Sequence, residues 1–317
     1  MKKVGFIRKK GNAKEVHILK RRFTKTLHSF VSFFCFAPNF LTYSENGFNF
    51  VDKTLSLNFK AVEYDENRYK LSPERKNVVN AFVMNATINW EPVVNINYWN
   101  PKLSVKGGTF KSSNSYYGIP YSLSNRYTTL PVFLQNLETK DGKTYYVGPS
   151  ENYLGSDCSS AIMYAFKETV DPFCDFLYTG GNFEGRIKSF ESVGDFDFNE
   201  EIFEKTGTLD IVKSNGKDKM FNSYKMVLPG DIILKHVRNK DGTEFGHVRM
   251  VLSVDSEKQT MVCADQTGVD EGRRLKGQNE KSTWQIDKTY TFDEIFKDGY
   301  IPLANKELLK LERSKKS

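Results

Sequence analysis

The sequence is poor in the residues that most often build metal and redox sites. It holds four cysteines and four histidines among 317 residues, and they do not follow the C-x-x-C or H-E-x-x-H spacing of common zinc sites. The cysteines also give no disulfide framework. The phosphate-binding pattern G-x-x-x-x-G-K-[ST] is missing as well. We therefore expect a chemistry that uses no metal and no cofactor.

Long apolar runs are scarce too, and a single stretch near the N-terminus stands out. Residues 29–41 (SFVSFFCFAPNFL) follow the basic segment 20–28, and this run is long enough for a signal-peptide core but too short for an ordinary membrane-spanning helix. Residues 1–44 are interpreted as a basic leader with an export or membrane-tethering signal. That interpretation predicts a protein of the cell envelope or a secreted one. The alternative is a buried hydrophobic segment behind a polar leader in a cytoplasmic protein.

The charge balance is basic, with a net charge of +7 and a sequence pI near 9.0. Lysines and arginines are spread along the whole chain and are densest at its two ends. Because no basic motif is interleaved with aromatic residues, we expect no nucleic acid partner. Solvated surface lysines explain most of the excess. The sequence carries no signal for an oligomeric state.

One cysteine lies where a thiol becomes reactive. Gly155 and Ser156 interrupt the preceding segment, and Ser156 or Asp157 can cap a helix. Apolar residues then recur at helical spacing, namely Ala161, Ile162, Ala165 and Phe166. Cys158 is therefore expected in the first helical turn, where backbone N–H groups and the helix dipole favour a thiolate and an oxyanion. The alternative is a small buried hydrophobic residue.

The four histidines are the candidates for a base that could activate this thiol. His17 and His28 lie in the basic N-terminal region, which has no strand or helix pattern. His236 ends an apolar run and precedes the turn-rich NKDGTE, so we predict a solvated hairpin residue. His247 follows Gly246 at the start of an alternating strand, with Arg249 on the same face. His247 is the predicted base.

A catalytic imidazole needs a third group that fixes its tautomer and orientation. The next predicted strand reads TMVCADQTG, in which Cys263 and Asp265 share one face. If this strand pairs antiparallel with the strand of His247, Asp265 can lie beside the imidazole. Gln266 points to the other side unless a bulge intervenes. Asp265 is therefore the predicted orienting residue.

Four short motifs together resemble the NlpC family of cell-wall cysteine peptidases. They are GIPYS (118–122), DCSS (157–160), LPGD (228–231) and GHVRMVLSV (246–254), and they occur in the order of the family. The resemblance spans roughly residues 72–303. It implies an α+β, papain-like fold in which a helix bearing the nucleophilic cysteine packs on an antiparallel β-sheet. It also implies hydrolysis of amide bonds in peptidoglycan stem peptides.

The resemblance also assigns roles to individual residues. It implies that Cys158 is the nucleophile, His247 the base and Asp265 the third catalytic residue. It further implies that a second set of residues lines the substrate cleft and recognises the amino end of the stem peptide, namely Tyr121, Asp157 and Ser159.

Two positions depart from the pattern of the family. Ser160 stands where the family commonly has a glycine, and Asp265 stands where it often has His, Asn or Gln. Two alternatives to a peptidase therefore stay open. One is an inactive wall-peptide binding or scaffold protein on the same fold. The other is an acyl or amide transferase that uses the same thioester.

The remaining sequence suggests the order of the parts. The predicted segments are a leader (1–44), an N-terminal helix and insertion (45–117), a catalytic domain (118–305) with an insertion at 171–226, and a basic tail (306–317). Ser72-Pro73-Glu74 should open a helix that packs behind the helix of Cys158. We also expect short helices at 199–205 and after the capping box of Thr291, with a polar loop at 214–219.

Overall fold

The computed structural model describes residues 41–44, 47–50, 70–97, 109–174, 187–242, 244–268, 274–275 and 279–315. The described residues all belong to one compact unit. The apolar run that we interpret as a signal lies outside the described residues except for Leu41, and so does the part of the predicted insertion at 175–186. Within the described ranges, no helix has both the length and the apolar character needed to cross a membrane.

The larger sheet is antiparallel throughout and has the strand order β14-β12-β11-β10-β15-β9. Its strands are β9 (Phe190–Ser192), β10 (Ile232–Arg238), β11 (Glu244–Asp255), β12 (Thr260–Gln266), β14 (Trp284–Thr291) and β15 (Ile301–Asn305). The long β10–β11–β12 meander therefore places the predicted strand of His247 at the centre of the sheet.

A second sheet is mixed and has the order β13-β6-β3-β8-β7. Its strands are β3 (Asn89–Pro92), β6 (Tyr116–Tyr117), β7 (Leu137–Lys140), β8 (Lys143–Tyr146) and β13 (Lys281–Ser282). Two further strand pairs are β1 (Leu41–Ser44) with β2 (Gly47–Phe50) and β4 (Ile96–Asn97) with β5 (Thr109–Phe110). The second sheet joins strands from both sides of residue 117, where the sequence suggested a boundary.

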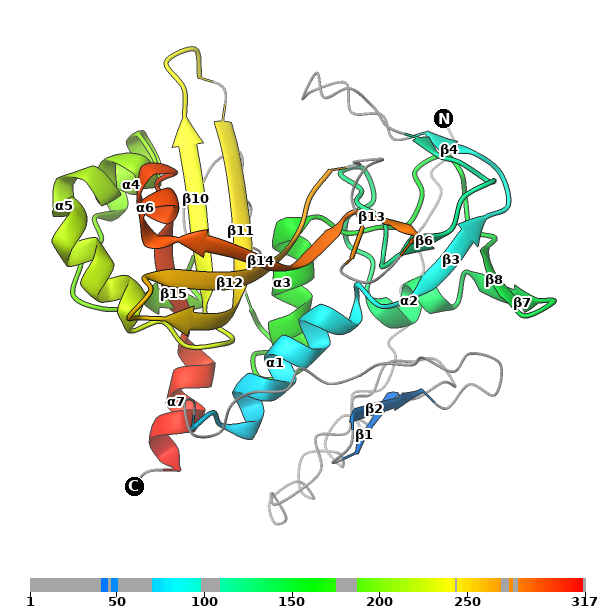
Figure 1. Cartoon of the computed structure of the whole chain (residues 1–317), viewed down its shortest axis with the longest axis horizontal. Coiled ribbons are helices and arrows are strands. Elements are labelled where there is room, and N and C mark those ends of the chain that lie inside the picture. The colour runs from blue at the N-terminus through cyan, green and yellow to red at the C-terminus, as the bar shows by residue number, and fades with distance from the viewer. Residues whose placement is uncertain are drawn as a thin grey trace, which may run out of the picture. The chain divides into compact units, whose positions relative to one another are not determined.

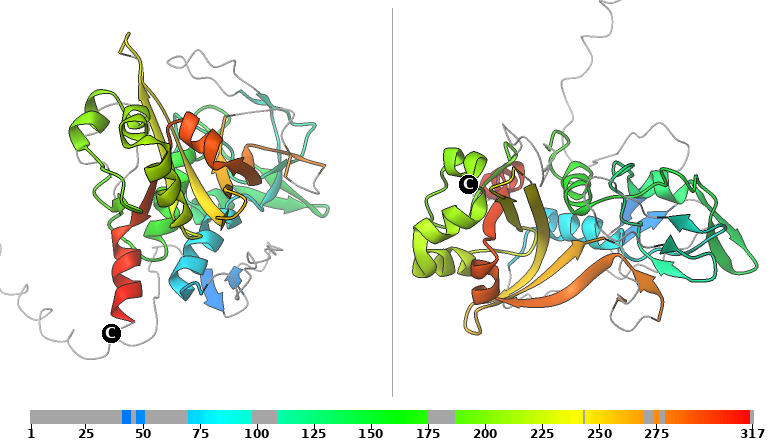
Figure 2. Two further views of the ribbon diagram at one scale, coloured as in Figure 1. Left: turned by 60° about the vertical axis from the view of Figure 1, so that its left-hand side comes forward. Right: turned by 90° about the horizontal axis from the view of Figure 1, so that it is seen from above.

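Most of the helices lie around the larger sheet, whereas α2 (Leu130–Leu134) lies beside the second sheet (Figure 1). The others are α1 (Pro73–Met84), α3 (Cys158–Lys167), α4 (Glu200–Lys205), α5 (Thr208–Lys225), α6 (Phe292–Lys297) and α7 (Lys306–Ser314). Helix α3 packs against α1, β11 and β12, whereas α5 packs against β10, β15 and α6 (Figure 1). Figure 2 shows α3 and α1 at one side of the sheet and α4 and α5 at the other. This arrangement confirms the predicted α+β class.

Helix α1 begins as the sequence predicts. Ser72 is the N-cap, its hydroxyl accepts a hydrogen bond from the backbone N–H of Arg75 at 3.2 Å, and Pro73 occupies the first turn. Val79 and Phe82 are buried on the side that faces the core. The predicted packing of α1 against the helix of Cys158 is therefore confirmed.

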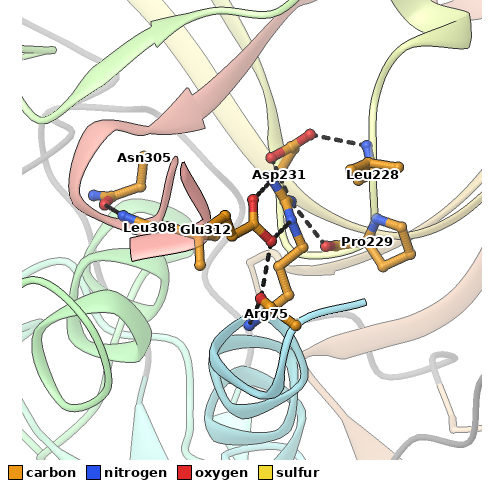
Figure 3. A network of polar contacts seen from close by, with 8 residues as sticks. Arg75, Leu228, Pro229, Asp231, Asn305, Leu308 and Glu312 are labelled. Atoms are coloured by element: carbon orange, nitrogen blue, oxygen red, sulfur yellow. Dashed lines mark hydrogen bonds and ion pairs between the residues drawn. The ribbon is translucent and has the colours of Figure 1, made fainter. Parts of the chain in front are cut away.

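A buried ion-pair network ties α1 to the C-terminal helix and to the turn before β10 (Figure 3). Arg75 Nη1 donates to Asp231 Oδ1 at 2.7 Å and to the carbonyl of Pro229 at 3.1 Å. Arg75 Nε donates to Glu312 Oε1 at 2.8 Å, which also accepts from Ser72 Oγ at 2.8 Å. The side chains of Arg75 and Asp231 are only 1% and 2% exposed. Three segments far apart in the sequence are thus joined around one guanidinium group.

The expected polar loop at 214–219 is wrong, because these residues lie within α5. The helix is kinked at Gly216, whose φ of 77° is a backbone conformation that glycine adopts without strain. Polar residues cover the exposed side of the helix, while Ile211 and Tyr224 are fully buried on the other side. Packing of this apolar side against the sheet holds the helix despite the weak helix propensity of Asn215 and Gly216.

The expectation for His236 is also wrong, because the side chain has no exposed surface. Its backbone exchanges hydrogen bonds with the hydroxyl of Thr208, at 2.9 Å from the N–H and 3.0 Å to the carbonyl, and its ring lies 5.6 Å from that of Phe203. Burial lowers the pKa of His236 to about 4, so the ring is neutral at pH 7. Helices α4 and α5 cover this end of β10, which the local sequence does not reveal.

The short helices predicted at 199–205 and after the capping box of Thr291 are confirmed by the structure. Asn199 caps α4, and Thr291 with Glu294 forms the capping box of α6. The basic tail forms helix α7, capped by Asn305. These short helices begin where the sequence places a side-chain acceptor, because such an acceptor satisfies an N–H group that the helix itself cannot.

Candidate active site

Helix α3 places Cys158 at its first position, as the sequence predicts. Asp157 is the N-cap, and its Oδ1 accepts from the backbone N–H of Ser160 at 2.7 Å. In return, Ser160 Oγ accepts from the backbone N–H of Asp157 at 2.9 Å, which completes a capping box. Ser160 is fully buried. At the position where the NlpC family commonly has a glycine, this chain thus uses the side chain to fix the start of the helix.

The carboxylate of Asp157 is engaged within the chain on both oxygens. Besides the cap, Oδ1 accepts from Ser159 Oγ at 2.9 Å, and Oδ2 accepts from Arg126 Nη1 at 3.1 Å. Ser159 has no exposed surface and Asp157 is 3% exposed. A contact of these two side chains with a substrate stays a prediction, and it would require them to become accessible.

Tyr121 lies next to the start of α3 through its backbone. It forms a parallel bridge with Ser156, and its carbonyl accepts from Tyr153 Oη at 2.6 Å. The side chain of Tyr121 is partly exposed. The structure therefore brings together Tyr121, Asp157 and Ser159 as the sequence motifs suggest, with Tyr121 the most accessible of the three.

His247 and Asp265 meet across neighbouring strands. Strands β11 and β12 are antiparallel, and His247 Nε2 lies 2.8 Å from Asp265 Oδ2. The imidazole is 12% exposed and the carboxylate is 3% exposed. The expected approach of Asp265 to the imidazole is confirmed, because the two-residue period of each strand puts both side chains on one face.

The electrostatics of this pair fix which ring nitrogen carries a proton. Burial alone would raise the pKa of Asp265, but the hydrogen bonds and charges of His247 and Arg249 outweigh burial and hold that pKa below its ordinary value. The ionised carboxylate can only accept hydrogen bonds. The neutral imidazole is therefore assigned its proton on Nε2, which leaves Nδ1 as the basic nitrogen.

Arg249 is a third member of this cluster, two residues after His247 on the same strand. Its Nε donates to the same oxygen, Asp265 Oδ2, at 3.0 Å. The guanidinium carbon lies 4.0 Å from the ring centre of Tyr290 and 4.4 Å from that of Tyr300. The sequence placed Arg249 on the face of His247 but offered no reason to give it a role, because both tyrosines are some forty or more residues away.

A buried glutamine connects the cysteine helix to the strand of Asp265. Ser156 Oγ donates to Gln266 Oε1 at 2.6 Å, and Gln266 Nε2 donates to the carbonyl of Ile119 at 2.8 Å. Gln266 follows Asp265 directly, whereas Ser156 precedes Cys158 by two residues. Together with the packing of α3 on β11 and β12, these bonds hold the start of the helix at the end of β12, where Asp265 binds the imidazole.

Of the other described thiols, Cys263 is unsuited to nucleophilic chemistry. Cys174 and Cys263 are both buried and free of disulfides. Burial raises the pKa of Cys263 to about 12, so this thiol stays protonated at neutral pH and is a poor nucleophile. Within the ranges that the structure describes, no group of three or more His, Cys, Asp or Glu side chains is placed to hold a metal ion.

Comparisons of the chain with family models, with curated proteins and with solved structures found no match. Any functional assignment therefore depends on the contacts described above and on the four short motifs. Among these contacts, the hydrogen bond between His247 and Asp265 indicates a chemistry most directly, since it joins an imidazole to a carboxylate. Cys158 at the helix start supplies the thiol that such a pair can activate.

Proposed function

We propose that this protein is a cysteine hydrolase that cleaves amide bonds in peptidoglycan stem peptides through a thioester on Cys158. The observation that carries the proposal is the hydrogen bond between His247 and Asp265 on strands against which α3 packs. A thiol at a helix start, an imidazole and an orienting carboxylate are the three parts of nucleophilic acyl transfer.

The proposed mechanism follows from the hydrogen-bonding roles of these groups. Nδ1 of His247 takes the proton of the Cys158 thiol, and the thiolate attacks the amide carbonyl. Backbone N–H groups in the first turn of α3 stabilise the oxyanion. The imidazolium then protonates the leaving amine, and the C–N bond breaks to leave a thioester. Water, deprotonated by His247, attacks the thioester and releases the acid and the thiol.

Asp265 has the supporting role in this scheme. As an ionised acceptor it holds Nε2–H, so Nδ1 is left to take the proton of the thiol, and it stabilises the imidazolium that forms during the reaction. The carboxylate remains ionised because its pKa lies below the ordinary range. It is therefore not itself a proton acceptor in the cycle.

The substrate class is supported by the four motifs that resemble the NlpC family. We extend the proposal to a papain-like variant of the α+β fold, since the helix of Cys158 packs on the antiparallel sheet of His247. Tyr121 is the proposed substrate contact among the residues near the start of α3, because it is partly exposed there. A wall substrate fits a protein of the envelope or a secreted one.

The test is digestion of purified peptidoglycan followed by mass analysis of the fragments. The proposal predicts new amino and carboxyl ends within the stem peptides, and C158S and H247A should produce none. C174A is the matched control, because it removes a buried thiol from another part of the fold. Intact peptidoglycan after treatment with the folded wild-type protein would overturn the proposal. Fragments joined to an added amine would instead identify a transferase.

A further inference from the structure

We propose that Arg249 is a positioning residue for the His247–Asp265 pair, an inference that rests on the proposed function. Arg249 is not a catalytic residue in this account, because it is placed to act on the carboxylate rather than on the substrate. Its Nε and the Nε2 of His247 share one oxygen, Asp265 Oδ2, at 3.0 Å and 2.8 Å. By bonding this oxygen, the arginine orients the carboxylate and leaves the imidazole to bond the other lone pair of Oδ2.

The guanidinium is held in place by two aromatic rings. The ring centre of Tyr290, on β14, lies 4.0 Å from the guanidinium carbon of Arg249. The ring centre of Tyr300 lies 4.4 Å from the same carbon. Tyr300 is itself fixed by a hydrogen bond from Tyr224 Oη to its carbonyl at 2.8 Å. A planar, permanently charged group stacked on aromatic faces has little rotational freedom. Arg249 therefore presents its Nε–H in one direction.

Burial strengthens the ion pair between Arg249 and Asp265. Arg249 is 11% exposed and Asp265 is 3% exposed, so water competes weakly for the carboxylate. Without the arginine, the carboxylate would lose the permanently charged partner that balances the cost of its burial and would keep only the hydrogen bond of His247. The carboxylate would then be harder to ionise and free to rotate away from His247.

Several other ionisable groups surround the cluster and belong to different elements. They are Lys235 on β10, Cys263 on β12, Lys288 and Tyr290 on β14, Asp298 after α6, and Tyr300 before β15. The two lysine ammonium groups lie over the tyrosine rings, at 5.8 Å for Lys235 over Tyr300 and 4.7 Å for Lys288 over Tyr290. Among the described residues, His247 and Arg249 are the groups that bond the Asp265 carboxylate directly, and Arg249 carries a permanent charge.

The experiment compares R249M, R249K and R238M in the full chain. R249M keeps an unbranched apolar stem but removes the guanidinium and its charge, and R249K keeps the charge without the planar fork. R238M is the matched control, because Arg238 pairs with Glu244 on the same strand pair and has no contact with Asp265. The first readout is the titration of the Asp265 carboxyl by carbon NMR, assigned with D265N, which needs no substrate. The second is the pH profile of kcat on peptidoglycan fragments.

The proposal predicts a higher titration midpoint for Asp265 in R249M, with the acid limb of kcat displaced in the same direction. The value of kcat itself should fall about tenfold, less than the ~10²-fold or more of a lost general base, while KM stays within twofold. R249K should restore the midpoint and part of kcat, and R238M should match the wild type. An unchanged midpoint in folded R249M overturns the proposal. Absence of hydrolysis by the wild type, with the midpoint shifted in R249M, would instead contradict the proposed function alone.

Discussion

At the residue scale, the site depends on how one buried carboxylate is balanced. Asp265 is almost without exposed surface, yet its interactions with His247 and Arg249 hold its pKa below the ordinary range. The sequence predicted Asp265 beside His247, because the two-residue strand period is a local rule. It could not assign Arg249, whose position depends on Tyr290 and Tyr300 from other elements.

Replacing the carboxylate should slow the reaction without stopping it. D265N keeps the shape of the side chain but lacks the charge that stabilises the imidazolium, so kcat should fall by a factor of about 10 to 10³, less than for H247A. Steady-state kinetics on peptidoglycan fragments at pH 7 measure this, with circular dichroism as the check on folding. Full activity of D265N would transfer the orienting role to another residue.

The same carboxylate should give the stability of the protein a defined pH dependence. The pKa of Asp265 is lower in the folded protein than its ordinary value of 3.8, so its contribution is present above that value and is lost as pH falls towards the folded pKa. Urea unfolding of wild type and D265N should therefore show a free-energy difference at pH 6 that shrinks below pH ~4. A difference that stays constant with pH would show that the charge contributes nothing to folding.

At the scale of the element, the start of α3 determines where the thiol lies. The capping box between Asp157 and Ser160, with Arg126 on the second oxygen, fixes the first turn. Caps were also the most successful predictions from sequence, as for Ser72 and Thr291, because a cap is a local pattern of a few residues. The failures at 214–219 and at His236 have a different cause. Both depend on packing against segments distant in the sequence.

Loss of the α3 cap should weaken both the fold and the site. D157A removes the cap and leaves Arg126 without its carboxylate, so the free energy of unfolding should fall by about 1–2 kcal/mol. Asp218 lies exposed on α5 and caps nothing, so D218A is the control, with a change within about 0.5 kcal/mol. Urea titrations of the two variants provide the comparison. Equal stability of D157A and D218A would contradict the importance of the cap.

At the scale of the whole described unit, Arg75 joins α1, the turn before β10 and α7 (Figure 3). The helix start at Ser72 was predictable, but the partners of Arg75 lie more than 150 positions away. Likewise, residues 45–117 and 306–317 were predicted as separate segments, whereas α1 and α7 are in contact. Local patterns therefore predicted elements well, and long-range polar pairing could be found only in three dimensions.

This network should be a main support of stability. R75M leaves Asp231 buried without its cation, so the free energy of unfolding should fall by about 3–5 kcal/mol. E312Q should cost less, about 1 kcal/mol, because Glu312 is partly exposed and Gln can still accept from Arg75. E307Q on the same helix removes an exposed pair with Lys310 and should change stability by at most about 0.5 kcal/mol. Urea unfolding of the three variants measures whether the loss of stability follows the predicted order, R75M, then E312Q, then E307Q. If R75M proved as stable as E307Q, the prediction would be contradicted.

The central claim is that the Cys158 thiol and the His247 imidazole form one reactive pair. The most direct measurement is the rate of Cys158 alkylation by iodoacetamide as a function of pH, read by peptide mapping in wild type and H247A. We predict a midpoint in the wild type well below pH ~8.5, the value of an ordinary thiol, and a return towards that value in H247A. A midpoint near pH ~8.5 in the wild type that does not move in H247A would contradict the claim.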